Sequence, residues 1–234
     1  MAEQLTFELA DVPPATFENF VAGPNSEAVS TLVRLARHDA RETGLVLWGA
    51  AGAGKTHLLR AAVTLAQAHG RDAWFVDAAS PVDAGVQGRD PFVAVDHVDR
   101  ADEAAQGRLF TLYNALAAQG GQLVAAADVP PARMSLRDDL RTRLGWGLVI
   151  EIEPLADADK PEALAGFARA RGFRLPPDAI GYLLAHGRRD MASLVHTLAA
   201  LDRHSLALQR PITLSLMREW LQRDIALPQR PPDR

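Results

Sequence analysis

Residues 49–56 read Gly-Ala-Ala-Gly-Ala-Gly-Lys-Thr, and this stretch decides the fold. It fits the pattern G-x-x-x-x-G-K-[ST], in which glycines let the backbone turn tightly and point its N–H groups at phosphate oxygens. Residues 45–48 are apolar and predict a buried strand, and residues 55–69 carry apolar side chains at helical spacing before Gly70. Strand, loop and helix are the context that the motif needs, so the sequence predicts a phosphate-binding loop.

The polar residues of this loop have expected tasks. Lys55 is expected to reach the β- and γ-phosphates, and the Thr56 hydroxyl to ligate Mg²⁺. The positive end of the following helix favours an anion at the same place. Asp96 ends another apolar strand, the third along the chain, and its carboxylate can hold the same Mg²⁺ directly or through water. The residues assigned to the nucleotide are Gly49, Gly52, Gly54, Lys55, Thr56, His57 and Asp96, with Thr56 and Asp96 as metal ligands.

Strands alternate with helices up to residue 153. Apolar runs at 73–76, 92–95, 122–127 and 148–152 predict four more strands, which gives an α/β fold with a five-stranded parallel sheet and helices on both faces. Ligands of such sheets bind at the carboxyl ends of the strands, where Gly49, Asp96 and Asp128 fall. Beyond Pro154 only helices are predicted, at about 157–171, 178–186, 191–208 and 214–223, with Asp157 and Asp190 as caps.

Composition excludes several classes of protein. The chain has 234 residues, a formal net charge of −4 and no cysteine. A protein that binds DNA by charge alone is usually basic, and without cysteine there is no disulfide framework, thiolate metal site or cysteine nucleophile. No apolar stretch approaches the length of a membrane span, and no signal-peptide pattern opens the chain. We therefore expect no membrane partner and a cytoplasmic location.

The segment before the first helix is unusually apolar. Residues 4–9 alternate polar and apolar side chains, which is typical of an edge strand or of a peptide that docks on another protein. Phe17, Phe20 and Val21 are too apolar for a solvated loop. They are expected to pack on the core or on a flat ligand such as an adenine ring.

Taken together, these motifs resemble the AAA+ ATPases of the DnaA-related family, and the short Hda type among them. The resemblance covers nearly all of residues 1–225. It implies an AAA+ P-loop NTPase core followed by a small all-helical lid domain. Two features favour the Hda type: the chain stops after the lid, without a helix-turn-helix DNA-binding domain, and residues 4–9 look like a sliding-clamp-binding peptide. The resemblance rests on residues 16–23, the phosphate loop, residues 112–116, 128–131 and 141–147, and the helical lid.

The resemblance also implies a function and its residues. A bacterial protein of this type would bind ADP or ATP with Mg²⁺ and promote hydrolysis of DnaA-bound ATP together with the DNA-loaded sliding clamp of DNA polymerase III, a negative regulation of replication initiation. Its partners are the clamp and DnaA, and a homodimer is allowed. The implied roles are Asp128 as sensor 1, Arg143 as an arginine finger acting in trans, Phe20 and Val21 at the nucleotide, and Gln4, Leu5, Phe7 and Leu9 on the clamp. The implied domains are a clamp-binding tail at 1–15, the core at 16–153, the lid at 154–227 and a disordered tail at 228–234.

Two positions depart from the family pattern. His97 stands where ATP-hydrolysing members place a second acid, and Ala192 stands where the lid carries its sensor-2 arginine, although Arg188 and Arg189 lie nearby. An imidazole is a weaker base for this geometry, so we expect little independent ATPase activity. The alternatives are a self-sufficient ATPase of the DnaA or helicase-loader type, a small P-loop kinase, and an adaptor with a vestigial loop.

Overall fold

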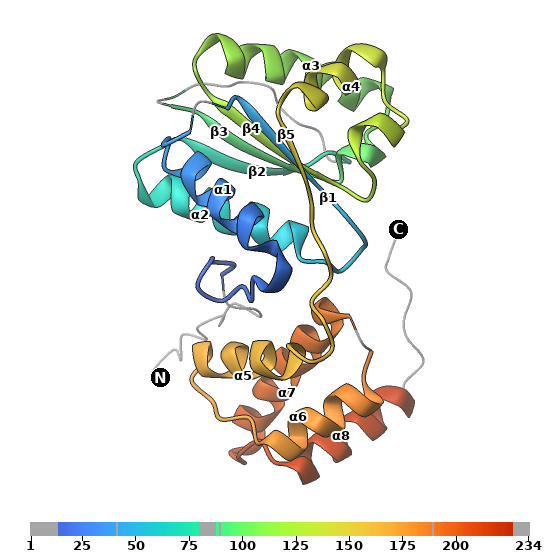
Figure 1. Ribbon diagram of the computed structural model, residues 1–234. Helices are drawn as coiled ribbons and strands as arrows, with labels where there is room; N and C mark the ends of the chain where they lie inside the picture. Colours follow the sequence, from blue (N-terminus) through green and yellow to red (C-terminus); the bar gives the residue numbers. More distant parts are fainter. Residues whose placement is uncertain (1–13, 41, 80–87, 89, 189, 227–234) are drawn as a thin grey trace, which may run out of the picture. The chain divides into compact units, whose positions relative to one another are not determined.

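A computed structural model describes residues 14–40, 42–79, 88, 90–188 and 190–226. These residues form two compact units, 14–156 and 157–226, and each has its own hydrophobic core (Figure 1). Across these ranges no helix has the length and apolar composition needed to cross a bilayer. The expected clamp-binding residues lie outside the described residues: Gln4, Leu5, Phe7 and Leu9.

Residues 14–156 are built on a five-stranded sheet in the order β2-β3-β4-β1-β5. All four strand pairs are parallel, which confirms the expected sheet. β3 and β4 are buried along their whole length, as expected for central strands covered on both faces. The strands are β1 (Gly44–Trp48), β2 (Ala73–Asp77), β3 (Phe92–Asp96), β4 (Gln122–Ala127) and β5 (Leu148–Glu151).

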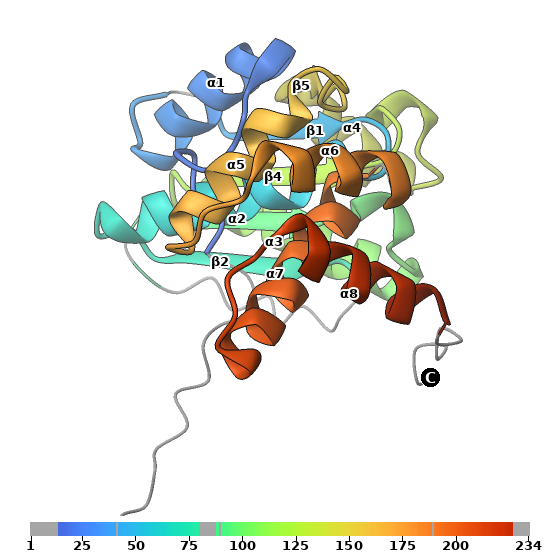
Figure 2. The same ribbon diagram turned by 90° about the horizontal axis from the view of Figure 1, so that it is seen from below.

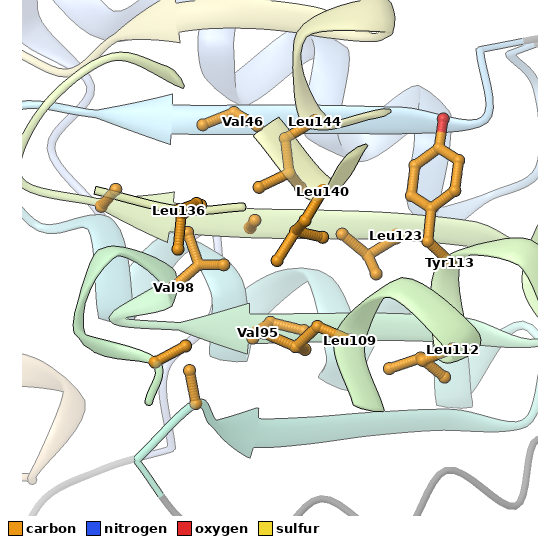
Figure 3. Close-up of a cluster of buried hydrophobic side chains, with 14 of the residues drawn as sticks. Val46, Val95, Val98, Leu109, Leu112, Tyr113, Leu123, Leu136, Leu140 and Leu144 are labelled. Atoms are coloured by element: carbon orange, nitrogen blue, oxygen red, sulfur yellow. The ribbon is translucent and has the colours of Figure 1, made fainter. Parts of the chain in front are cut away.

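Two pairs of helices cover the sheet. α1 (Ser26–Ala36) and α2 (Lys55–Ala68) lie on one face, and α3 (Glu103–Ala118) and α4 (Asp138–Trp146) lie on the other (Figure 1). Between the sheet and the second pair, Val46, Val95 and Leu123 meet leucines of both helices (Figure 3). Three short 3₁₀ segments, η1 (Gly23–Asn25), η2 (Val98–Arg100) and η3 (Pro131–Arg133), connect these elements.

Apolar residues at helical spacing predict a helix over about 26–40, but α1 ends at Ala36. His38 takes the left-handed conformation, with φ +61°. Its N–H donates to the Leu35 carbonyl, and the Asp39 N–H donates to the Arg34 carbonyl. This is the Schellman pattern that closes a helix, here without the glycine that usually announces it.

A buried asparagine fixes the end of the sheet unit. Asn25 donates its Nδ2 to the Glu153 carbonyl at 2.9 Å, and its Oδ1 accepts from the Glu153 N–H at 2.9 Å. One residue earlier, the Ile152 N–H donates to the Trp48 carbonyl at 2.7 Å. The chain that leaves β5 is therefore hydrogen-bonded to β1 through Trp48 and to η1 through Asn25.

Residues 157–226 form a helical unit, as expected for a lid. α6 and α8 run side by side in both ribbon views (Figures 1 and 2). Asp190 caps α7 as predicted, accepting from the Ser193 N–H at 2.9 Å. The predicted cap at Asp157 is wrong, because its carboxylate pairs with Lys160 at 2.6 Å and α5 begins at Lys160. The helices are α5 (Lys160–Ala170), α6 (Pro177–His186), α7 (Met191–Leu208) and α8 (Leu214–Ala226).

Candidate nucleotide-binding site

The phosphate loop joins β1 to α2, and its shape depends on glycine. Gly49, Gly52 and Gly54 have φ values of +154°, +80° and +100°. A Cβ on Gly49 would lie 2.2 Å from the Ile152 carbonyl oxygen, and one on Gly54 would lie 2.8 Å from the Phe20 ring. At Gly49 and Gly54, the positive φ and the close neighbours together leave no room for a side chain.

Lys55 is buried at the start of α2, and its ammonium group points back into the loop. Its Nζ donates to the carbonyls of Gly49 at 2.6 Å and Ala50 at 3.0 Å, and to Oδ1 of Asp128 at 3.1 Å. Asp128 directly follows β4, the strand beside β1. Two residues that lie 73 positions apart thus form an ion pair at the carboxyl ends of neighbouring strands.

Thr56 and Asp96 meet beside this pair. The Thr56 hydroxyl donates to Oδ2 of Asp96 at 2.6 Å, and Oδ1 of Asp96 accepts from the His97 N–H at 2.9 Å. A hydroxyl and a carboxylate are the oxygen ligands that Mg²⁺ accepts, so these residues fit the ion expected here. The described residues contain no group of three acidic or histidine side chains that could hold a metal. Mg²⁺ is usually held by one or two protein ligands together with phosphates and water, and Thr56 and Asp96 can supply such ligands.

Asp128 has a second cation, which the sequence analysis missed. Nη2 of Arg100 lies 2.9 Å from Oδ2 of Asp128, and the Asp128 N–H donates to Oδ2 of Asp99 at 3.0 Å. The hydrogen bond from Arg100 and the charge of Lys55 hold the pKa of Asp128 below its usual range, against the opposing effect of burial. The carboxylate is therefore ionised at neutral pH, between two cations.

A tight turn after β3 brings Asp99 and Arg100 to this place. His97 has φ +51°, and η2 then turns the chain toward the end of β4. The available sequence signal was an acidic and a basic residue three and four positions beyond Asp96. Such a signal is weak without knowledge of the turn.

The His97 side chain is held at the edge of the sheet. Its Nδ1 lies 3.0 Å from Oδ2 of Asp77, the last residue of edge strand β2, and Oδ1 of Asp77 accepts from the Ala79 N–H at 2.9 Å. Burial alone would raise the pKa of Asp77, but these hydrogen bonds outweigh it and lower that pKa. β2 and β4 lie on opposite sides of β3 in the sheet. His97 contacts Asp77 at the end of β2, whereas Asp128 follows β4.

His57 and Phe20 lie behind the loop. Phe17 and Phe20 pack against the cluster between the sheet and α1 and α2, which fits the expected core packing. The Phe20 and His57 ring centroids are 5.5 Å apart, and His57 Nε2 donates to the Thr16 carbonyl at 2.9 Å. Burial lowers the pKa of His57, and the bond to Thr16 only partly opposes this. His57 thus joins the entering chain to α2 as a neutral ring. Val21 is partly exposed.

Arg143 lies in the last turn of α4, apart from the residues above. Its guanidinium carbon is 4.5 Å from the ring centre of Trp146, 5.6 Å from that of Phe110 and 6.0 Å from that of Tyr113. No carboxylate of the described residues pairs with it. Trp146 is 66% exposed. An arginine stacked on aromatic faces keeps its charge and its donors available to a ligand.

The sensor-2 position lies in the helical unit. Ala192 is exposed in the first turn of α7, and Arg188 pairs with Asp190 at 3.3 Å. Arg189 lies outside the described residues.

Two family models match the chain. The model described as the bacterial DnaA ATPase domain matches residues 13–79 and 92–151, and the model described as the Hda lid domain matches residues 157–221. The two matches fall within the sheet unit and the helical unit respectively, apart from residue 13.

Solved structures of DnaA have the same fold. Domain III of the Thermotoga maritima replication initiation protein DnaA is 23% identical with a TM-score of 0.77, over 92% of this chain and 98% of that one. AMPPCP-bound DnaA from Aquifex aeolicus is 20% identical with a TM-score of 0.68, over 92% and 70%. A replication initiator DnaA bound to AMPPCP and single-stranded DNA is 23% identical with a TM-score of 0.65, over 81% and 64%. These likenesses show a shared fold, a parallel-sheet core followed by a helical unit.

Proposed function

Because the chain belongs to the family of bacterial DnaA ATPase domains and is close to Hda, we propose that it regulates replication initiation by promoting hydrolysis of DnaA-bound ATP. In this proposal it acts together with the DNA-loaded sliding clamp, as a negative regulator. The observation that carries the proposal is Arg143, a guanidinium on an aromatic face without an acidic partner among the described residues. Residues 1–15 serve as the clamp-binding tail, 16–153 as the core, 154–227 as the lid and 228–234 as a terminal tail.

The chain itself binds ADP or ATP in this proposal. Lys55 and the loop amides hold the phosphates, and Thr56 with Asp96 holds Mg²⁺, which offsets phosphate charge when bound. Phe20 and Val21 border the base. The support is the burial of Lys55, the 2.6 Å contact between Thr56 and Asp96, and the AMPPCP bound by two DnaA relatives of the same fold.

The reaction takes place on DnaA. The tail holds the protein on the clamp, and Arg143 enters the nucleotide site of DnaA. There its planar fork contacts the terminal phosphate and stabilises the negative charge that builds up as water attacks. The chain thus contributes one cation to an active site whose remaining parts belong to DnaA.

The chain alone is expected to hydrolyse ATP very slowly. His97 replaces an acid and is bound to Asp77, on the side of β3 away from Asp128, and Ala192 offers no cation. Phosphate release by the purified full chain should stay far below the turnover of about 1 s⁻¹ at the low end of ordinary enzymes. The Lys55→Ala variant measures the contaminating background. A Lys55-dependent turnover near 1 s⁻¹ would instead favour the self-sufficient ATPase.

Clamp docking and DnaA stimulation are expected to separate. A peptide in an apolar groove is held by alternate side chains, so changing both Gln4 and Leu5 to alanine should abolish retention on immobilised clamp. The same variant should still stimulate DnaA weakly at high concentration, because only effective concentration is lost. Glu8→Ala, in the same tail, is the matched control and should bind normally.

A reconstituted assay with DnaA, clamp and DNA tests the function as a whole. At low concentration, the wild-type chain should accelerate hydrolysis of DnaA-bound ATP strongly only when clamp and DNA are present. Equal stimulation with and without clamp would refute the clamp-dependent role.

A further inference from the structure

The charges around Asp128 change when a nucleotide enters the loop. In the structure, one carboxylate oxygen of Asp128 faces Lys55 and the other faces Arg100. A nucleotide draws the Lys55 ammonium to its phosphates. Asp128 then loses part of the positive charge that balances it, while its carboxylate stays at the end of β4 because Asp99 holds its backbone N–H.

A carboxylate whose charge is no longer balanced at this place disfavours binding of the third phosphate of ATP more than binding of the second phosphate, which ATP and ADP share. Like charges a few ångströms apart repel each other, and the γ-phosphate that distinguishes ATP from ADP extends toward the ends of the strands. Within the described residues, Arg100 is the one cation other than Lys55 that contacts Asp128.

We propose that Arg100 is a specificity-determining residue of the nucleotide site, which offsets the charge of Asp128 and thereby sets the affinity for ATP relative to ADP. This inference rests on the proposed nucleotide binding. Arg100 acts through Asp128: its Nη2 is committed to Oδ2, and its side chain is 57% exposed, so it approaches the carboxylate from the solvent side. It is a positioning residue rather than a phosphate ligand.

Titration calorimetry of the full chain with Mg-ATP and Mg-ADP at low salt tests this role. Arg100→Ala should weaken ATP binding about fivefold and ADP binding less than about twofold. Arg100→Lys keeps the charge and should restore most of the ratio. The shift should shrink as salt rises, because exposed charges are screened. Arg34→Ala is the matched control: Arg34 is 56% exposed and pairs with Glu42 at 3.9 Å, and its loss should leave the ratio unchanged.

A double substitution separates action through Asp128 from direct contact with phosphate. In an Asp128→Asn background there is no charge to offset, so adding Arg100→Ala should leave the ATP-to-ADP ratio unchanged. The inference is wrong if Arg100→Ala alone leaves the ATP-to-ADP affinity ratio unchanged. It is also wrong if Arg100→Ala lowers ATP affinity as much in the Asp128→Asn background as it does alone. If the wild-type chain binds neither nucleotide, the proposed nucleotide binding fails as well, which is a distinct result.

Discussion

Arg143→Ala is expected to reduce stimulation of DnaA's ATP hydrolysis to background, a loss of about 10³-fold or more, because an arginine supplied in trans contributes on that order. Binding to immobilised clamp should be normal, since Arg143 lies in α4 and the clamp is assigned to the tail. Single-turnover hydrolysis of DnaA-bound ATP, followed over a range of concentrations, measures the effect. Unlike the variant with Gln4 and Leu5 changed to alanine, Arg143→Ala should not regain stimulation of DnaA at high concentration.

Two further variants sharpen the result. Arg143→Lys keeps a positive charge but loses the planar fork that holds phosphate at two points, so it should remain strongly impaired. Arg137 lies just before the same helix and pairs with Asp139 at 2.8 Å. The Arg137→Ala variant should stimulate DnaA normally. If Arg143→Ala stimulates like the wild type, the finger is wrong and the proposed role reduces to that of a clamp adaptor.

Lys55→Ala is expected to abolish binding of both ADP and ATP. It removes the cation aimed at the β- and γ-phosphates, and charge-assisted hydrogen bonds of this kind make a loss of roughly 100-fold or more reasonable. Calorimetry measures the affinity. Nucleotide should also raise the melting temperature of the wild-type chain and leave that of the variant unchanged, because only a ligand that binds the folded state stabilises it.

The matched control for this substitution lies on the same helix. Arg60 is an exposed cation of α2 whose guanidinium carbon stacks 4.0 Å from the Phe75 ring centre, and Arg60→Ala should bind nucleotide normally. The melting temperature of Lys55→Ala without nucleotide shows whether the variant folds. Unchanged affinity in a folded Lys55→Ala variant would rule out the phosphate-loop interpretation.

Much of the fold could be predicted because it depends on local patterns. The apolar runs that became β1, β3 and β4 are continuous, as parallel strands buried on both faces require. The phosphate loop carries its own signature, and it lies between a strand and a helix as predicted. The end of α1 could not be predicted in this way, because His38 adopts a conformation that normally calls for glycine or asparagine.

The contacts within the candidate site were harder to predict, because they depend on strand register and on turns. Asp77 lies opposite Asp96 in the pairing of β2 with β3, and this alone brings it to His97. Arg100 reaches Asp128 only because His97 turns the chain at positive φ. No spacing rule in the sequence links residue 77 to 97 or residue 100 to 128. The residues of the motif could therefore be predicted from the sequence, whereas their neighbours could not.

The pair of hydrogen bonds between Asn25 and Glu153 limits the backbone conformations available to the chain as it leaves residue 153. Residue 153 is fixed by two hydrogen bonds and the helical unit starts at residue 157, so the intervening backbone is Pro154, Leu155 and Ala156. The proline ring locks one torsion of these three residues. The backbone is thus restricted where it leaves residue 153. A glycine in place of Pro154 would remove the restriction set by the ring without touching a phosphate ligand.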